Sequence, residues 1–387
     1  MMIEDWRNGG FGLYIHWPFC QSKCPYCDFN SHVAASIDQN RWKSAYLREI
    51  ERVGSETQGR ILDSVFFGGG TPSLMQPDVV AAVIDAIRRT WACRNDLEIT
   101  LEANPGSVER TRFQGFREAG VNRLSMGIQA LNDRDLRALG RLHSVEDALR
   151  AFDVARTTFE RVSFDLIYAR QAQTLDEWRR ELSLALSLSV DHLSMYQLTI
   201  EEGTAFGDRF AAGRLRDLPD EGLAADMYDL TQELCEAAGM AAYEVSNHAK
   251  EGAESRHNLI YWRGGDYIGI GPGAHGRLTF GDQRLATEAI KTPGGWLSGV
   301  EAGQRIEQRD RLTPEERAIE YILMGLRLSE GIDLTRLQTV SRLEPPQPAV
   351  NELVDLGMLS QIGPRITATP NGRLVLNSVI KALVNAL

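Results

Sequence analysis

Three cysteines near the amino terminus have the residue type and the spacing that iron–sulfur chemistry requires. Cys20, Cys24 and Cys27 form a Cys-x3-Cys-x2-Cys pattern, in a short segment that also holds Pro18 and Pro25. Each thiolate can bind one iron of a [4Fe–4S] cluster, and a set of three leaves the fourth iron open to an outside ligand. We therefore expect Cys20, Cys24 and Cys27 to bind a [4Fe–4S] cluster that has one reactive iron.

Two other uses of these cysteines are less favoured. A zinc site needs a fourth cysteine or histidine at short spacing, and His32 is the only nearby candidate after Cys27. A disulfide framework does not suit five cysteines in a long chain whose first residues do not read as a secretion signal. Cys93 and Cys235 lie in partly apolar patterns with helical spacing, which predict ordinary buried thiols.

The composition narrows the class of protein. The chain of 387 residues has room for one large domain of barrel or doubly wound type and a small one. Its 42 basic and 53 acidic residues give a net charge of −11, which argues against a surface that coats nucleic acid. No run of about 18 or more apolar residues occurs, so we expect no transmembrane segment and a soluble, cytoplasmic protein.

Short β-rich runs alternate with helical patterns through the first two-thirds of the chain, and this alternation predicts a parallel sheet. The predicted strands are Leu13–His16, Ser64–Phe67, Glu98–Glu102, Arg123–Gly127, Val162–Ile167 and His192–Leu198. The amphipathic stretches between them are Asp78–Arg89, Val108–Ala119, Val145–Thr157 and Leu175–Leu188. Six such strands predict an α/β fold built as an open, partial (β/α)6 barrel of the TIM type.

The chain changes character near residue 305, which predicts a barrel domain of residues 1–304 and a small α+β domain of residues 305–387. Thr313, Pro314 and Glu316 have the pattern of a helix N-cap, a first-turn proline and a capping-box glutamate. A helix is therefore expected to begin there and to run through Leu326.

The remainder of the small domain has the order of a winged helix. A proline-rich break at residues 345–348 precedes a predicted short helix, Val350–Leu356. The segment Arg365–Leu376 is expected to form two short strands around Pro370-Asn371-Gly372, followed by a terminal helix. Because few basic residues cluster here, a packing or lid role is favoured over DNA binding.

Glycines and polar residues follow the predicted strands at the ends where a parallel barrel gathers its ligands. The cysteine segment follows the first strand, and Gly68-Gly69-Gly70-Thr71-Pro72 follows the second. Glycines let backbone groups approach a ligand closely, because no Cβ intervenes. Glu102 ends the third strand, Gln129 follows the fourth, and Asp165 lies near the end of the fifth. We expect these residues to share a ligand site; the alternative is that each caps a helix or forms a local ion pair.

The cysteine spacing resembles that of the radical S-adenosylmethionine (SAM) enzymes, in which SAM chelates the open iron and is cleaved to a 5′-deoxyadenosyl radical. Nearly the whole chain is similar to the family of oxygen-independent coproporphyrinogen III oxidases and their relatives. The similar segments are Tyr14–Cys20, Gly68–Pro72, Glu102, Gly127–Gln129, Gly140–His143 and Asp165–Tyr168. The resemblance implies a [4Fe–4S] cluster and SAM as cofactors, and as SAM contacts it implies Tyr14, Gly69, Gly70, Thr71, Glu102, Gln129, Arg141 and Asp165.

Two features point away from the oxidases and toward the heme-chaperone members of this family. Position 29 is Phe where the oxidase pattern has a fourth cysteine, and no oxidase-like extension precedes the first strand. The segment His257–Trp262 resembles a His-Asn-x-x-Tyr-Trp pattern of the chaperone group. A histidine can ligate heme iron and aromatic rings can cover a porphyrin face, so His257 is the candidate heme ligand. The alternative is a hydrogen-bonded structural histidine beside core aromatics.

Two positions depart from the family pattern. Ala169-Arg170-Gln171 stands where relatives carry Gly-Leu-Pro, so the backbone beside Asp165 can differ. His248 stands where an aromatic residue is expected. It is either a second heme ligand or, as we favour, a polar residue of the surface.

The resemblance implies a heme chaperone that binds heme and transfers it to apo-hemoproteins, with an electron donor for its cluster. Two enzymes remain as alternatives: an oxygen-independent coproporphyrinogen III oxidase and a radical SAM methyltransferase on the same framework. Phe29 and the His257 segment favour the chaperone over the oxidase. The methyltransferase stays open, because substrate pockets are formed by loops whose shape the sequence does not specify.

Overall fold

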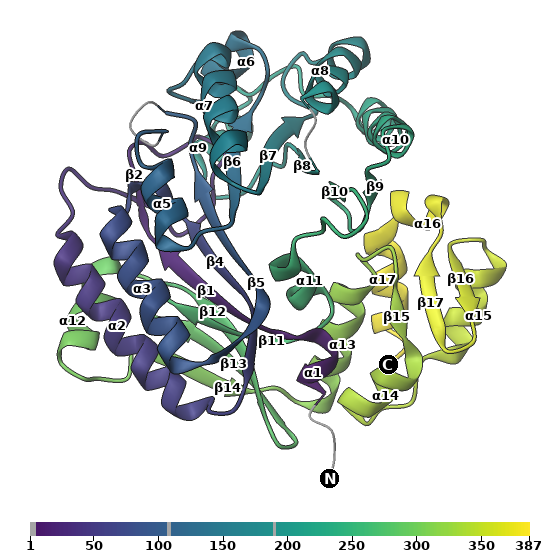
Figure 1. Ribbon diagram of the computed structural model, residues 1–387. Helices are drawn as coiled ribbons and strands as arrows, with labels where there is room; N and C mark the ends of the chain where they lie inside the picture. Colours follow the sequence, from purple (N-terminus) through teal and green to yellow (C-terminus); the bar gives the residue numbers. More distant parts are fainter. Residues whose placement is uncertain (1–4, 107–109, 189–190) are drawn as a thin grey trace.

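The first long strand, β1 (Phe11–Trp17), is buried along almost its whole length and lies in the middle of the main sheet. The structure is a computed structural model that describes residues 5–106, 110–188 and 191–387. In these residues the strand order of the main sheet is β14-β13-β12-β11-β1-β4-β5-β6-β7-β8-β10-β9 (Figure 1). The strands from β11 to β8 in this order are parallel, and those at either side are antiparallel.

The six predicted strands are confirmed as parallel neighbours, and with them the partial barrel. Besides β1 they are β4 (Ile61–Gly69), β5 (Ala92–Ala103), β6 (Arg123–Gln129), β7 (Arg161–Tyr168) and β8 (His192–Gln197). A further parallel strand, β11 (Asp266–Ile270), pairs with the free side of β1 and was not among the predicted strands. The antiparallel strands are β12 (His275–Phe280), β13 (Gln283–Ala289), β14 (Glu307–Arg311), β10 (Asn247–Ala249) and β9 (Ala241–Ala242).

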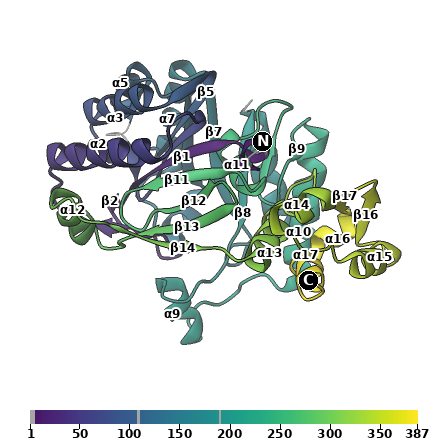
Figure 2. The same cartoon turned by 90° about the horizontal axis from the view of Figure 1, so that it is seen from below.

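Helices cover the outer face of the parallel strands and pack side by side (Figures 1 and 2). They are α2 (Gln39–Glu56), α3 (Pro77–Thr90), α5 (Phe113–Ala119), α7 (Val145–Thr158), α8 (Leu175–Ser187) and α10 (Glu221–Ala237). Capping boxes begin two of them, at Ser144 with Asp147 and at Thr174 with Glu177. The helix predicted over Val108–Ala119 is not continuous in the described residues: Arg110 is helical, a turn follows, and α5 begins at Phe113, while residues 107–109 lie outside the described part of the chain.

Short elements connect these layers. They are α1 (Trp6–Gly9), β2 (Phe19–Cys20), β3 (His32–Val33), η1 (Pro72–Leu74), α6 (Asp133–Ala138), α9 (Ala205–Ala211), α11 (Arg256–Trp262) and α12 (Pro293–Glu301). Helix α9 stands away from the main body in Figure 2, yet it is joined to the cysteine segment, because the Phe206 N–H donates to the Pro25 carbonyl at 2.8 Å.

An aromatic cluster supports the start of the cysteine segment. Trp17 and Phe19 pack edge-on, with ring centroids 5.2 Å apart, and both pack against Trp42 of α2. Trp296 of α12 stacks on Trp42 with centroids 5.5 Å apart and planes within 4°. Aromatic side chains bury large apolar areas at low entropic cost, so the segment begins from a rigid base.

The small carboxyl-terminal domain has its own core (Figure 1). A three-stranded sheet, in the order β15-β17-β16, packs with five helices in the described residues. Its elements are α13 (Pro314–Gly325), β15 (Ile332–Asp333), α14 (Leu334–Ser341), α15 (Gln347–Asp355), β16 (Leu359–Ile362), β17 (Arg365–Ala368), α16 (Pro370–Leu374) and α17 (Leu376–Val384). The predicted capping box at Thr313 and Glu316 is confirmed, and α13 starts after it.

Two expectations for this domain are wrong. The Pro370-Asn371-Gly372 segment begins helix α16 instead of connecting two strands, because the Thr369 hydroxyl caps the Gly372 N–H and proline suits a first helical turn. The hairpin partner of β17 is β16, before Gly363. The proline-rich break is also shorter than expected, since α15 already begins at Gln347 with a proline in its first turn.

Three single-residue expectations can be compared with the structure. Cys93 lies half-buried in strand β5, so a buried helical position is wrong for it, whereas Cys235 is buried in helix α10 as predicted. His248 is buried in β10, so the favoured surface position is wrong.

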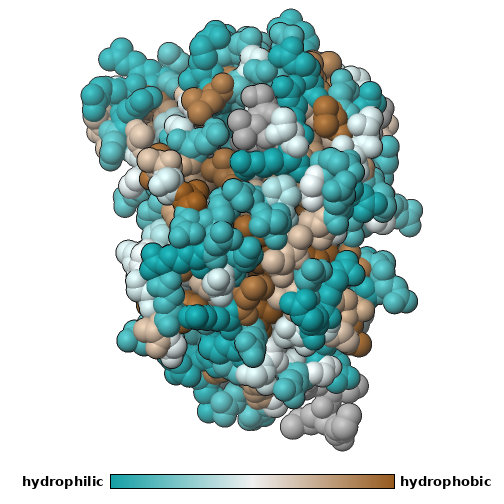
Figure 3. Space-filling view, turned by 60° about the vertical axis from the view of Figure 1, so that its left-hand side comes forward, coloured by the Kyte–Doolittle hydropathy of each residue, from teal (hydrophilic) through white to brown (hydrophobic). Residues whose placement is uncertain are grey.

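In the described residues no helix has the length and apolar character needed to cross a membrane. The face shown in Figure 3 is mainly hydrophilic, with small separate hydrophobic groups.

Candidate functional site

The cysteine segment and the glycine segment are held together by backbone hydrogen bonds at the carboxyl ends of β1 and β4. The Gly70 N–H donates to the Trp17 carbonyl at 2.7 Å, and the Thr71 N–H donates to the Phe19 carbonyl at 2.8 Å. A Cβ on Gly70 would lie only 2.7 Å from the Phe19 carbonyl oxygen. Glycine is therefore required at position 70 by the contact between the two segments.

The three predicted cluster ligands lie half-buried in this segment. Burial raises the pKa of the Cys20 and Cys27 thiols, and the charge of the nearby Cys24 raises both further, so the three sulfurs are close enough to interact. In the part of the chain that is described, no three His, Cys, Asp or Glu side chains are placed to hold one metal ion. In a cubic cluster each thiolate binds a different iron, so the three sulfurs need not meet at one ion.

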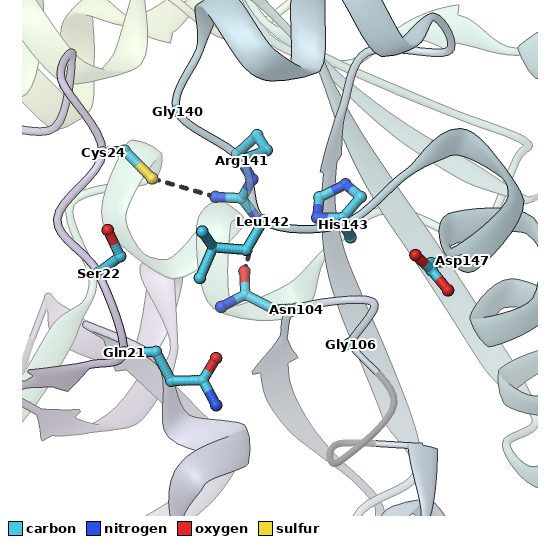
Figure 4. Close-up of a pocket in the computed structure, with 10 residues that line it drawn as sticks. All are labelled: Gln21, Ser22, Cys24, Asn104, Gly106, Gly140, Arg141, Leu142, His143 and Asp147. Atoms are coloured by element: carbon cyan, nitrogen blue, oxygen red, sulfur yellow. Dashed lines mark hydrogen bonds between the residues drawn. The ribbon is translucent and has the colours of Figure 1, made fainter.

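Two hydrogen-bond donors reach these sulfurs, and one asparagine connects the donors. Figure 4 shows Arg141 between Cys24 and Asn104. The Thr71 hydroxyl lies 3.5 Å from Cys20 Sγ, and Arg141 Nη1 lies 3.3 Å from Cys24 Sγ. Asn104 donates to the Thr71 hydroxyl at 3.2 Å and accepts from Arg141 Nη2 at 2.6 Å. The chain Cys20-Thr71-Asn104-Arg141-Cys24 therefore surrounds one side of the cysteine segment.

Arg141 also donates to the Gly127 carbonyl at 2.7 Å. A Cβ on Gly127 would lie 3.0 Å from Gln129 Nε2 and 3.4 Å from Arg141 Nη2, so glycine leaves room for both side chains. Gln129 ends β6 with a positive φ of 73°, beside an irregularity in the pairing of β6 with β7. The Gly127-Ile128-Gln129 turn thus places Gln129 next to Arg141.

Two carboxyl groups lie on the inner face of the barrel at this level. Burial raises the pKa of Glu102 to about 8, and the charge of Asp165 raises it further, while the Gly69 N–H donates to Glu102. Burial raises the pKa of Asp165 to about 6, against a lowering by its hydrogen bond with Ser194. Tyr14 lies near Glu102, and burial followed by that carboxylate raises its pKa well above the usual value.

A pocket of about 240 Å³ lies beside the cysteine segment and Arg141 (Figure 4). Cys24, Asn104 and Arg141 line it, together with Gln21 and His143. Arg141 Nε is buried there without a hydrogen-bond partner among the described atoms. A buried donor of this kind calls for an acceptor, and Arg141 can pair with a carboxylate.

These observations fit the two implied cofactors. Three interacting thiols can hold three irons of a [4Fe–4S] cluster. The carboxyl group of Glu102 can accept hydrogen bonds from ribose hydroxyls, and the Arg141 guanidinium can bind a carboxylate. Bound together, the cluster and SAM would supply one-electron cleavage chemistry at the carboxyl ends of the strands.

His257 lies nearer the amino-terminal ends of the strands, next to Tyr14, on whose ring it stacks with centroids 6.2 Å apart. Its Nδ1 is 2.9 Å from the Ser64 hydroxyl, and Ser64 precedes Gly69 on β4 by roughly 16 Å. Its Nε2 is 2.9 Å from the Tyr261 hydroxyl, and its ring stacks on Phe66 with centroids 4.8 Å apart. Burial lowers the pKa of His257 to about 3. Heme ligation by His257 therefore requires that one of these two hydrogen bonds be broken.

The structure thus brings most of the predicted residues into one region, and His257 lies beside that region. Cys20, Cys24, Thr71 and Arg141 are joined by hydrogen bonds through Asn104. Tyr14 lies inside β1, and its ring stacks on that of His257 with centroids 6.2 Å apart. Asn104 was not among the predicted site residues. Its place two residues after Glu102 was the only signal, and its role follows from two long-range contacts.

Comparison with known proteins agrees with this architecture. The profile described as Radical SAM superfamily matches residues 14–185, and that described as HemN C-terminal domain matches residues 312–375. A solved structure of coproporphyrinogen III oxidase (HemN) from Escherichia coli has a TM-score of 0.81 at 22% identity, covering 98% of this chain and 91% of that one. This similarity shows the fold.

Proteins with similar sequences match almost the whole length of this chain. The heme chaperone HemW of Escherichia coli (strain K12) is 37% identical over 374 residues, which are 95% of this chain and 97% of HemW. The mitochondrial radical S-adenosyl methionine domain-containing protein 1 of Bos taurus is 38% identical over 387 residues, which are 97% of this chain and 87% of the relative. The chain therefore belongs to the radical SAM superfamily and, within it, to the family that includes HemW.

Proposed function

We propose that this protein is a heme chaperone that binds a SAM-ligated [4Fe–4S] cluster, binds heme, and transfers heme to apo-hemoproteins. The observation that carries the proposal is the near full-length similarity to proteins named heme chaperone HemW. The arrangement of three thiols, Arg141 and Glu102 at one end of the barrel supports the cluster and SAM.

One anaerobic experiment tests the function. Heme is added to the cluster-loaded protein, and transfer to an apo-hemoprotein is followed by the acceptor's Soret band. A parallel sample receives coproporphyrinogen III, SAM and a reductant. We expect heme transfer and no decarboxylation. Robust decarboxylation of coproporphyrinogen III would instead identify the protein as a coproporphyrinogen III oxidase. A variant with Ala at Cys20, Cys24 and Cys27 should lose the cluster by iron and sulfide analysis.

The heme ligand needs its own test, because His257 is engaged at both ring nitrogens. The Tyr261→Phe variant keeps the imidazole and removes the hydroxyl that bonds Nε2. If His257 ligates heme, His257→Ala should lose or shift the heme Soret band, and Tyr261→Phe should bind heme at least as tightly as the wild type. If His275→Ala or His248→Ala changes the band and His257→Ala does not, the ligand lies at that histidine.

SAM binding is tested most sharply at Glu102. Gly70→Val is a poor test, since the added side chain would strike the Phe19 backbone and disturb the cysteine segment. Glu102→Gln keeps the size and replaces one carboxyl oxygen by an amide nitrogen, which cannot accept a hydrogen bond. We expect about tenfold weaker SAM binding by calorimetry in the cluster-loaded variant, because one hydrogen-bond acceptor for the ribose is lost. Exposed Glu146→Gln is the matched control.

A further inference from the structure

A second hollow adjoins the cysteine segment and is lined by positive side chains. Its volume is about 510 Å³, and Cys24 and Cys27 contribute to its wall. Lys23 of the cysteine segment, Arg137 of α6 and Arg209 of α9 also line it, whereas none of the described lining residues is Asp or Glu. Three segments that are distant in the sequence therefore place their cations around two of the predicted cluster ligands.

These three cations are exposed and form no ion pair with any carboxylate in the described residues. Nearby arginines differ: Arg134 pairs with Asp135 at 2.9 Å, and Arg141 is occupied by Asn104. An acidic protein of net charge −11 thus keeps at this hollow a group of positive charges that have no carboxylate partner in the described part of the chain, although Arg209 lies over the Phe206 ring at 5.8 Å. Such a local field attracts negatively charged partners and raises their rate of association.

We propose that this hollow is the docking surface for an acidic electron-carrier protein that reduces the cluster. The inference rests on the proposed function, because it needs the [4Fe–4S] cluster. The three cations are exposed and lie on separate segments, which suits an extended acidic surface better than a small anion, whose sites use buried, convergent donors. Phe29 and Phe210, next to these segments, are 58% and 55% exposed and add apolar contact area.

The electron balance is simple. The carrier, with a reduced flavin or iron–sulfur centre, is oxidised by one electron, and the cluster is reduced from the 2+ to the 1+ state. No bond between heavy atoms forms or breaks in this step. Because Cys24 and Cys27 are part of the wall of the hollow, a carrier seated there brings its redox centre close to the cluster.

The test uses the full chain and a photoreduced flavodoxin as the acidic probe. The variant carries Lys23→Glu, Arg137→Glu and Arg209→Glu, and its matched control carries Lys381→Glu, an exposed lysine of α17. Cluster reduction is followed by stopped-flow absorbance with flavodoxin and, separately, with reduced methyl viologen, a small cation. At low salt we expect the flavodoxin rate to fall about tenfold or more in the triple variant alone. The methyl viologen rate should not fall.

A second measurement tests docking of flavodoxin in protein that lacks the cluster. Calorimetry of flavodoxin with cluster-free wild-type protein should show binding that weakens with salt and is lost in the triple variant. An unchanged flavodoxin rate in the triple variant, or an equal loss in the control, overturns the proposal. Binding abolished by inorganic pyrophosphate at constant ionic strength would replace it by a small-anion site. A chain that binds no iron refutes the proposed cofactor, independently of docking.

Discussion

Asn104 is the residue whose side chain connects the two donors that reach cluster thiols, at 3.2 Å to Thr71 and 2.6 Å to Arg141. Hydrogen bonds to cluster sulfurs influence the reduction potential. Asn104→Leu keeps the approximate size and removes both contacts, so we expect a lower midpoint potential in an electron-paramagnetic-resonance titration. Gln21→Leu, in the same pocket without such contacts, is the control. Equal potentials for Asn104→Leu and wild type would contradict this role.

Glu102 predicts a pH dependence of stability in the cluster-free protein. Its folded pKa of about 8 exceeds the ordinary value of 4.5, so the folded state holds a proton that the unfolded state releases between these pH values. Stability is therefore lost as pH rises from about 4.5 to 8 and does not change further above that range through this group. Thermal unfolding of Glu102→Gln should depend less on pH between 6 and 8 and give a higher Tm at pH 8. Parallel curves for variant and wild type would show that the carboxyl is not perturbed.

At the scale of elements, the segment Ala169-Arg170-Gln171, which differs from the family pattern, joins the end of β7 to helices α6 and α8. Ala169 has a positive φ of 57°, where relatives are expected to carry glycine. Buried Arg170 pairs with Asp135 of α6 at 2.8 Å and with Glu181 of α8. The junction therefore fixes two helices relative to the end of β7, close to Asp165.

Arg170→Met should leave two buried carboxylates without their shared partner. We expect the free energy of unfolding to fall by about 3 kcal/mol or more, because breaking a buried ion pair strands the remaining charges. Arg134→Met removes an exposed partner of the same Asp135 and should cost less than about 1 kcal/mol. Urea unfolding of both variants measures this difference. Similar losses in the free energy of unfolding would mean that the buried ion pairs of Arg170 do not stabilise the fold more than the exposed pair of Arg134 does.

At the scale of the whole molecule, Arg336 ties the small domain to the start of the chain and to α11. It contacts both carboxylate oxygens of Asp5 at 2.9 Å and donates to the Arg263 carbonyl at 2.7 Å. Arg263 in turn pairs with Glu330 at 2.8 Å. The helix that carries His257 is thereby held against the small domain.

Arg336→Gln should loosen this contact between the domains. We expect a loss of about 1 to 2 kcal/mol in stability from the charge-assisted hydrogen bonds and faster tryptic cleavage between the domains. Arg342→Gln, whose side chain is 65% exposed and 3.5 Å from Asp282, serves as the control. Cleavage at the wild-type rate in Arg336→Gln would mean that other contacts hold the domains together.

The sequence by itself determined the features that depend on neighbouring residues. The cysteine spacing, the alternation of strands and helices, and the capping box at Thr313 are local patterns, and the strand order and α13 confirm the last two. The expectation of a parallel barrel followed because β–α alternation permits few arrangements. It also placed the glycine segment and Glu102 at one end of the sheet.

Only the tertiary structure decided the features that depend on distant partners. Asn104 meets Arg141 across the site, the two ring nitrogens of His257 are bonded to Ser64 and Tyr261, and His248 is buried. None of these follows from spacing, since each depends on which side chains packing brings within hydrogen-bond distance. For the same reason the three exposed cations beside Cys24 and Cys27 form one surface only when three separate segments converge.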